Sequence, residues 1–137
     1  MKKILALLMC ALMVFSLVSC KKSEEKIPES EARESVKYEE KGEGENQFYL
    51  DIFFESDEKH YDIKTDEETV GAALESLKLI VGEEGPYGLY ISSVEGEEHV
   101  YENGGKYWAF YAGNQYADKS VDLTDIQNGE TYALKVE

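Results

Sequence analysis

The chain has 137 residues and a formal net charge of −15, from 29 acidic and 14 basic residues. This charge argues against nucleic acid as a partner, and against contact of the folded protein with anionic lipid headgroups, because both are themselves anionic. The only two cysteines, Cys10 and Cys20, lie near the N-terminus, so no disulfide, thiolate metal site or cysteine nucleophile is expected in the rest of the chain.

The N-terminus has the features of a secretion signal. A basic start at residues 1–3 precedes an apolar run at 4–18 that is too short for a membrane span. The run ends in Leu-Val-Ser-Cys at 17–20, which resembles the bacterial lipobox, whose cysteine is lipid-modified before cleavage. We therefore predict a lipoprotein signal peptide at 1–19, a lipidated Cys20, and a location on the extracytoplasmic face of the cell membrane. The alternative is a plain secretory signal with an incidental cysteine.

The segment that follows, residues 20–45, consists mainly of Glu, Lys and Ser and contains almost no large apolar residue. Such a segment cannot bury enough apolar surface to offset the entropy of ordering the chain. We predict a disordered tether that begins at the lipidated cysteine. The remaining residues, 46–137, have the usual size of one small domain.

The domain begins with a pattern that is typical of a β-hairpin. Residues 48–54 alternate so that one face carries Phe48, Leu50, Ile52 and Phe54. A second strand is predicted at 60–64, after the polar turn at 56–59.

The apolar spacing then changes to that of a helix. Steps of four, three and four residues connect Val70, Leu74, Leu77 and Val81. This spacing predicts a helix over 67–79, with Thr65 or Asp66 as its N-cap and Gly82 at its exit.

Three further strands are predicted at 87–94, 106–112 and 130–136, separated by turns that contain Asn-Gly or Gly-Asn pairs. A hairpin, a helix and three more strands predict an α+β domain that is β-grasp-like, with a mixed sheet of about five strands packed on one helix. Another α+β sandwich of the same elements is the alternative.

The residues that enzyme chemistry needs are scarce. His60 and His99, the only histidines, lie in charged stretches and are interpreted as solvated surface residues. The sequence contains no HExxH motif, EF-hand spacing, glycine-rich phosphate loop or G-x-S-x-G elbow. We therefore expect no enzyme activity, no metal site and no required cofactor.

An aromatic cluster instead favours a binding function. Six of the ten tyrosines lie between Tyr87 and Tyr116, together with the only tryptophan. Strand alternation places Trp108 and Phe110 on one face of their strand, and Tyr107 and Tyr111 on the other. One face is expected to fill the core, and the other to meet solvent or a partner.

These residues also resemble a known family. The stretches Tyr-Gly-Leu-Tyr-Ile-Ser-Ser-Val at 87–94, Lys-Tyr-Trp-Ala-Phe-Tyr-Ala-Gly at 106–113 and Gly-Glu-Thr-Tyr at 129–132 occur in the same order as in the C-terminal β domain of transcobalamin and intrinsic factor. They are more similar still to a bacterial lipoprotein domain of unknown function that resembles this β domain. The helix start Thr-Val-Gly-Ala-Ala-Leu at 69–74 fits the upstream part of that domain.

The resemblance implies a β-grasp-like fold and a face that packs against a corrinoid such as cobalamin. Carried over by position, the polar and backbone contacts fall on Ile91, Ser92 and Ser93, the apolar contacts on Trp108, Phe110 and Tyr111, and the rim on Gln115 and Tyr116. The exposed tyrosines Tyr90 and Tyr107 complete the predicted ligand-binding surface.

The vitamin carriers use a second, helical domain for the other face of the ligand, and this chain is too short to contain one. The resemblance therefore implies that a partner, such as a membrane uptake transporter, closes the site. The alternative function is a protein or cell-surface interaction module that uses the same aromatic strand face.

Overall fold

The computed structural model describes residues 36–137, and Val36–Glu137 form one compact unit with its own core. The predicted signal peptide at 1–19, the lipidated Cys20 and the first part of the tether lie outside the described residues. Within residues 36–137, no helix is long and apolar enough to cross a membrane.

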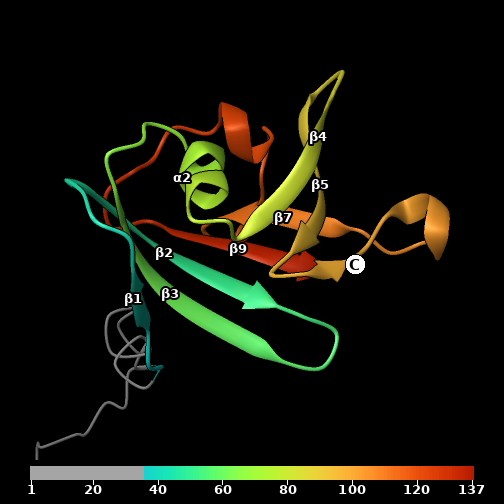
Figure 1. Ribbon diagram of the computed structural model, residues 1–137, viewed down its shortest axis with the longest axis horizontal. Helices are drawn as coiled ribbons and strands as arrows, with labels where there is room; N and C mark the ends of the chain where they lie inside the picture. Colours follow the sequence, from blue (N-terminus) through green and yellow to red (C-terminus); the bar gives the residue numbers. More distant parts are fainter. Residues whose placement is uncertain (1–35) are drawn as a thin grey trace, which may run out of the picture. The chain divides into compact units, whose positions relative to one another are not determined.

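A mixed sheet of six strands forms the base of the unit (Figure 1). Its strands are β1 (Glu39–Lys41), β2 (Asn46–Phe53), β3 (Glu58–Thr65), β7 (Trp108–Ala112), β8 (Gln115–Tyr116) and β9 (Thr131–Val136), in the spatial order β1-β3-β2-β9-β7-β8. The pairs β1–β3 and β2–β9 are parallel, and the other neighbours are antiparallel.

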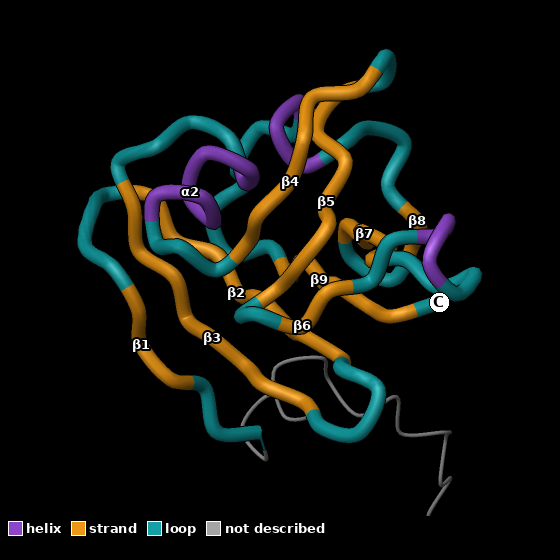
Figure 2. Tube along the Cα trace, turned by 45° about the vertical axis from the view of Figure 1, so that its right-hand side comes forward, coloured by secondary structure: helices purple, strands orange, loops and turns teal. Residues whose placement is uncertain are grey.

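The remaining elements lie outside the six-stranded sheet, and most of them form a second layer. They are the helix α2 (Val70–Ser76), the strands β4 (Ile80–Gly85), β5 (Gly88–Val94) and β6 (Glu97–Glu98) of a three-stranded sheet, and the 3-10 turns η1 (Tyr101–Asn103) and η2 (Val121–Leu123). Figure 1 and Figure 2 show α2 and the β4–β5 hairpin on the same side of the large sheet.

The core lies between the two layers and follows the alternation of β2. Phe48, Leu50 and Ile52 are fully buried, and their neighbours Tyr49 and Asp51 are only partly covered. Apolar side chains from α2, β5, β7 and β9 complete the same cluster, with Val70, Leu74, Val94, Phe110, Tyr132 and Leu134 among its members. The period-two pattern therefore identifies the buried face of the first hairpin correctly.

The helix is shorter than predicted, and it is followed by a strand that the sequence analysis missed. It starts at Val70, because the Thr69 side chain caps it by accepting a hydrogen bond from the Ala72 N–H group at 3.2 Å. It ends at Ser76, and Val81 and Gly82 lie in β4 rather than at the helix exit. The side chain of Val81 is 61% exposed, so its place in the helical spacing was coincidental.

The ordered domain also begins earlier than residue 46. Glu39–Lys41 form β1, which pairs with β3 and lies within the segment predicted to be a tether. Gly42, with φ +77°, comes directly after β1 and lies very close to β3. A Cβ atom at Gly42 would be 2.3 Å from the Lys64 carbonyl oxygen. Backbone pairing with β3 and the contacts of the Tyr38 ring with Tyr49 and His60 order this segment, and its overall composition did not predict them.

Residues 36–137 are mostly β, with one helix that covers a mixed sheet. The predicted fold class is confirmed at this level. The first hairpin, β2–β3, and the three later strands are present. The structure adds the separate three-stranded sheet, which carries β5 away from the large sheet. This separation leaves room for a groove between the two sheets.

Candidate functional site

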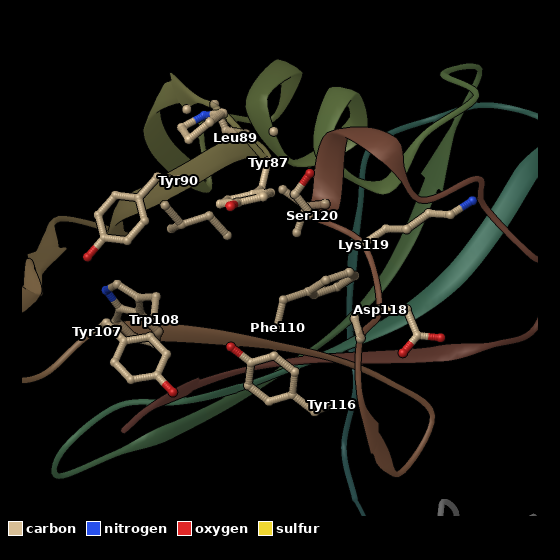
Figure 3. Close-up of a pocket in the computed structure, with 16 residues that line it drawn as sticks. Tyr87, Leu89, Tyr90, Tyr107, Trp108, Phe110, Tyr116, Asp118, Lys119 and Ser120 are labelled. Atoms are coloured by element: carbon tan, nitrogen blue, oxygen red, sulfur yellow. The ribbon is translucent and has the colours of Figure 1, made fainter.

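A groove of about 390 Å³ lies between the two sheets (Figure 3). Three segments line it: 85–91 from the β4–β5 hairpin, 107–110 around β7, and 116–121 from β8 to η2. In Figure 3, Tyr87, Leu89 and Tyr90 face Trp108, Phe110 and Tyr116 across an open space, with Ser120 at one end. Most of the named lining side chains are apolar or aromatic, as is usual for small-molecule sites.

The floor of the groove is the outermost layer of the core. Trp108 and Phe110 are 5% and 7% exposed. The Phe110 ring stacks on Tyr132 with ring centroids 5.9 Å apart, and the Trp108 indole N–H donates to the Glu97 carbonyl oxygen at 3.0 Å. These contacts hold both rings in place, so the groove has a rigid aromatic floor.

The rim, in contrast, carries exposed tyrosines. Tyr87 is 90% exposed, Tyr116 56% and Tyr90 40%. A hydrogen bond with Tyr116 and the electrostatic effect of that group, together with burial and the neighbouring Glu137 carboxylate, raise the pKa of Tyr107 to about 12. Exposed aromatic rings with polar tips around an apolar floor are suited to binding an amphipathic ligand.

One carboxylate connects the two walls at one end of the groove. The Asp122 Oδ1 atom accepts hydrogen bonds from the Leu89 N–H group, at 2.9 Å, and from the Ser120 hydroxyl. Burial alone would raise the pKa of the Asp122 carboxyl, but these bonds and further backbone N–H donors outweigh it and hold the pKa below its ordinary value. Gly88 has φ +109°, and a Cβ atom there would lie 1.9 Å from the Ser120 Oγ atom, so the junction requires glycine.

The structure brings together six of the ten residues predicted to bind ligand. Those that line the groove are Tyr90, Ile91, Tyr107, Trp108, Phe110 and Tyr116. Ser92, Ser93, Tyr111 and Gln115 lie outside its lining. The alternation of β7 separates Trp108 and Phe110, in the core, from Tyr111, whose ring lies under the Lys135 ammonium group at 4.4 Å.

Ser92 does not line the groove, and it lies at a β-bulge. Val81 pairs with Ser93, but the next residue of β4, Gly82, pairs with Ile91, so Ser92 is the additional residue. Its hydroxyl donates to the Val81 carbonyl oxygen at 3.1 Å. A bulge redirects the side chains that follow it, and the sequence contains no sign of it.

Sequence reasoning missed the wall formed by residues 117–121 and the contributions of Tyr87 and Leu89. Residues 117–121 have neither helical nor strand periodicity, and they reach the groove only because η2 packs against α2 and β5. The exposed Tyr87 lies beside Pro86 at the turn of a hairpin. A Pro followed by an aromatic residue at a turn was the one available signal.

The two histidines lie outside the groove, and the interpretation of them as solvated residues is wrong. Their side chains are only 16% and 12% exposed. His60 contacts the Asp51 carboxylate, and His99 contacts the Glu97 carboxylate, each at 2.7 Å. The neighbouring acidic residues that suggested a solvated surface are instead the partners that cover these rings.

Several solved structures resemble the fold, including the following two. One is a proposed metal-binding protein from Ruminococcus gnavus ATCC 29149, with 26% sequence identity and a TM-score of 0.63 over 68% of this chain and 97% of that one. The other is haptocorrin in complex with Cbi, with 14% identity and a TM-score of 0.56. The match to haptocorrin covers 67% of this chain but only 25% of haptocorrin. No curated protein matches the chain.

The match to a family model covers the helix, the second sheet and every segment that lines the groove. It extends over residues 67–137, which is more than half of the chain. The sequence similarity thus spans the part of the fold in which the groove lies, and the chain belongs to the family described as a domain of unknown function, DUF4430.

Proposed function

We propose that the chain is a lipid-anchored, extracytoplasmic binding module, β-grasp-like in its folded part, whose aromatic groove binds a corrinoid such as cobalamin. The observation that carries the proposal is the groove itself, with the rigid floor of Trp108 and Phe110 and the exposed rim of Tyr87, Tyr90 and Tyr116. We propose binding rather than catalysis, because binding in this groove requires neither an acid–base pair nor a nucleophile.

Two likenesses support the ligand class. The sequence stretches at 87–94 and 106–113 resemble the β domain of vitamin carriers, and haptocorrin, which has a similar fold, was solved in complex with Cbi. A corrin macrocycle presents an apolar ring with amide side chains at its edge. An aromatic floor matches the ring, and the tyrosine hydroxyls of the rim match the amides.

The size of the groove supports a role for a partner. Its volume of about 390 Å³ lies near the lower end of the roughly 300–1,000 Å³ that is typical of small-molecule sites, which bury about 70–90% of their ligand. A corrinoid on this groove would leave its outer face uncovered. We propose that a membrane uptake transporter or another surface protein covers that face.

The second candidate is a module that binds a protein or cell-surface partner through the same rim. The exposure of Tyr87, 90% at the turn of the β4–β5 hairpin, favours it. An exposed tyrosine on a turn is a common anchor in protein interfaces. This function needs no small molecule in the groove.

Corrinoid binding can be measured through Trp108, the only tryptophan in the chain. Titrating cobinamide into Val36–Glu137, with correction for its absorbance, is expected to give saturable quenching. Tyr87→Ala and Tyr116→Ala are each expected to weaken binding about tenfold, because each removes an exposed aromatic ring of the rim.

Val81→Ala is the control, because the Val81 side chain is 61% exposed and does not line the groove. Its affinity should equal that of the unchanged protein. An absence of saturable quenching up to about 0.1 mM cobinamide would argue against unassisted corrinoid binding. If Tyr87→Ala also removed a partner from a membrane pull-down, the protein-interaction function would gain support.

The anchor is tested separately. The full-length chain is expected to incorporate labelled fatty acid when expressed in a bacterial host, and Cys20→Ser is expected to abolish the label and release the protein from the membrane fraction. Cys10→Ser is the control, because Cys10 lies inside the predicted signal peptide. Label that persists in Cys20→Ser would contradict a lipid on this cysteine.

A further inference from the structure

A second group of ionisable side chains lies behind the groove floor. It consists of Glu55, in the β2–β3 loop, Glu97 of β6, and His99 just after β6. One ligand atom from each, a carboxylate oxygen or an imidazole nitrogen, lies within 4.8 Å of the others. None of the three lines the groove, so the proposed binding function does not use them.

Both carboxylates approach the same atom of the histidine ring. The His99 Nε2 atom lies 2.7 Å from Glu97 Oε1 and 3.9 Å from Glu55 Oε2. His60 also contacts two carboxylates, but Asp51 approaches its Nδ1 atom and Glu58 its Nε2 atom. Carboxylates on opposite sides of a ring cannot share one ion with it, whereas those around His99 can.

The surrounding contacts hold this arrangement in place. The indole N–H of Trp108 donates to the Glu97 carbonyl oxygen, and the Trp108 ring meets the His99 ring edge to face with centroids 5.6 Å apart. The backbone N–H of His99 donates to the Ser92 carbonyl oxygen at 2.9 Å, and that of Glu55 donates to Glu97 Oε1 at 3.3 Å. The imidazole is thus fixed by packing before any ligand binds.

Access and geometry suit a small cation. The side chains of Glu55 and Glu97 are 43% and 34% exposed, so an ion can reach them from solvent and their carboxylates can rotate. Tetrahedral zinc with N and O ligands at about 2.0–2.2 Å needs ligand atoms roughly 3.3–3.6 Å apart. The observed separations of 2.7 and 3.9 Å lie on either side of this range.

We propose that Glu55, Glu97 and His99 form a binding site for a divalent transition-metal ion. Two carboxylates and one imidazole suit Zn²⁺, with its fourth position open to water. The ion would neutralise the charges of Glu55 and Glu97, and Glu55 is also paired with the Lys106 ammonium group. In this site Lys106 competes with the metal for Glu55, so its removal should strengthen metal binding.

The first test is calorimetric titration of Zn²⁺ into Val36–Glu137, which contains neither cysteine. One saturable site is expected. His99→Gln, Glu97→Gln and Glu55→Gln should each weaken binding at least about tenfold, since even residues that only orient a metal ligand change affinity about 10- to 100-fold. His60→Gln is the matched control, and it should bind within about twofold of the unchanged protein.

A gain of affinity supplies the second test. Lys106→Gln is expected to bind Zn²⁺ several-fold more tightly, whereas Lys64→Gln, which makes the same charge change next to Glu40, should not. Cu²⁺ bound at the site should quench Trp108 fluorescence, and His99→Gln should remove that quenching.

Binding without saturation, or Zn²⁺ affinity that His99→Gln leaves unchanged, would overturn the proposal. If far-UV circular dichroism shows that His99→Gln is unfolded, the Zn²⁺ affinity of Glu55→Gln becomes the deciding measurement. Glu55 is exposed and lies in a loop, so its replacement should leave the fold intact. Cobinamide binding to the groove is measured in a separate titration. A negative result for Zn²⁺ therefore leaves the test of corrinoid binding unaffected, and the reverse also holds.

Discussion

Replacing Asp122 with alanine is expected to lower the free energy of unfolding by about 2–3 kcal/mol, the scale of hydrogen bonds to a charged acceptor. The change leaves the Leu89 N–H group and the Ser120 hydroxyl without their shared acceptor. The rim formed by β5 should loosen at the same time, so cobinamide affinity should fall with stability. Urea denaturation followed by circular dichroism measures the first effect, and titration measures the second.

The stabilisation by Asp122 should also depend on pH. Its folded-state pKa lies below the ordinary value, because hydrogen bonds from Ser120 and backbone N–H groups outweigh the effect of burial. The contribution is therefore fully present above the pKa of an unfolded aspartate and is lost as the pH falls through the lower, folded-state value. The stability difference between Asp122→Ala and the unchanged protein should shrink between pH 7 and about pH 2.5.

Asp118→Ala is the control, because Asp118 is exposed at the same end of the groove. Its effect at pH 7 should stay within about 0.5 kcal/mol, as for most surface substitutions. An equal loss in both variants would show that net charge, rather than the Asp122 junction, is responsible.

Gly71→Ala is expected to destabilise the protein by about 2 kcal/mol, although alanine is the better helix former. A Cβ atom at Gly71 would lie 2.6 Å from the Asp122 backbone nitrogen and 2.9 Å from the Val121 carbonyl carbon. Backbone atoms cannot move aside by changing rotamer, so α2 and η2 must separate, and overpacking of this kind costs about 1–3 kcal/mol. The gain in helix propensity is at most about 1 kcal/mol, so the clash dominates.

Ala72→Gly measures the effect of helix propensity alone, at the neighbouring helical position, which is only partly buried. It should cost about 0.5–1 kcal/mol through helix propensity. A Gly71→Ala protein that is more stable than the unchanged chain would show that α2 and η2 can separate at no cost. The two variants together distinguish local propensity from close packing.

Alternation along strands predicted much of the fold. Phe48, Leu50 and Ile52 identified the buried face of β2, and Trp108 and Phe110 that of β7, because a sheet with one covered face selects apolar residues at every second position. The same logic missed β4. Val81 continued the helical spacing of α2 and was therefore assigned to the helix. The glutamates of β4 face solvent, so the strand lacks the alternating apolar residues by which a strand is recognised in a sequence.

The site was predictable only where it coincides with a strand. Trp108 and Phe110 were found through their strand pattern, whereas the same pattern placed Tyr107, which lies just before β7, on the opposite face, although it lines the groove with them. The wall at 117–121 is positioned by contacts with distant segments, including Gly71 and Leu89, and local spacing carries no information about these. The approach of two glutamates to one nitrogen of His99 likewise depends on how the loop after β2 meets β6.

The place of β9 in the sheet has a consequence for the order of folding. This strand follows all the others in sequence, yet it lies between β2 and β7 and pairs with both. A nascent chain therefore has the two outer parts of the sheet before it has the strand that joins them, and contacts of long sequence separation must form last. Newly made chains should remain sensitive to protease until β9 is available, and become resistant in a single cooperative step once it pairs.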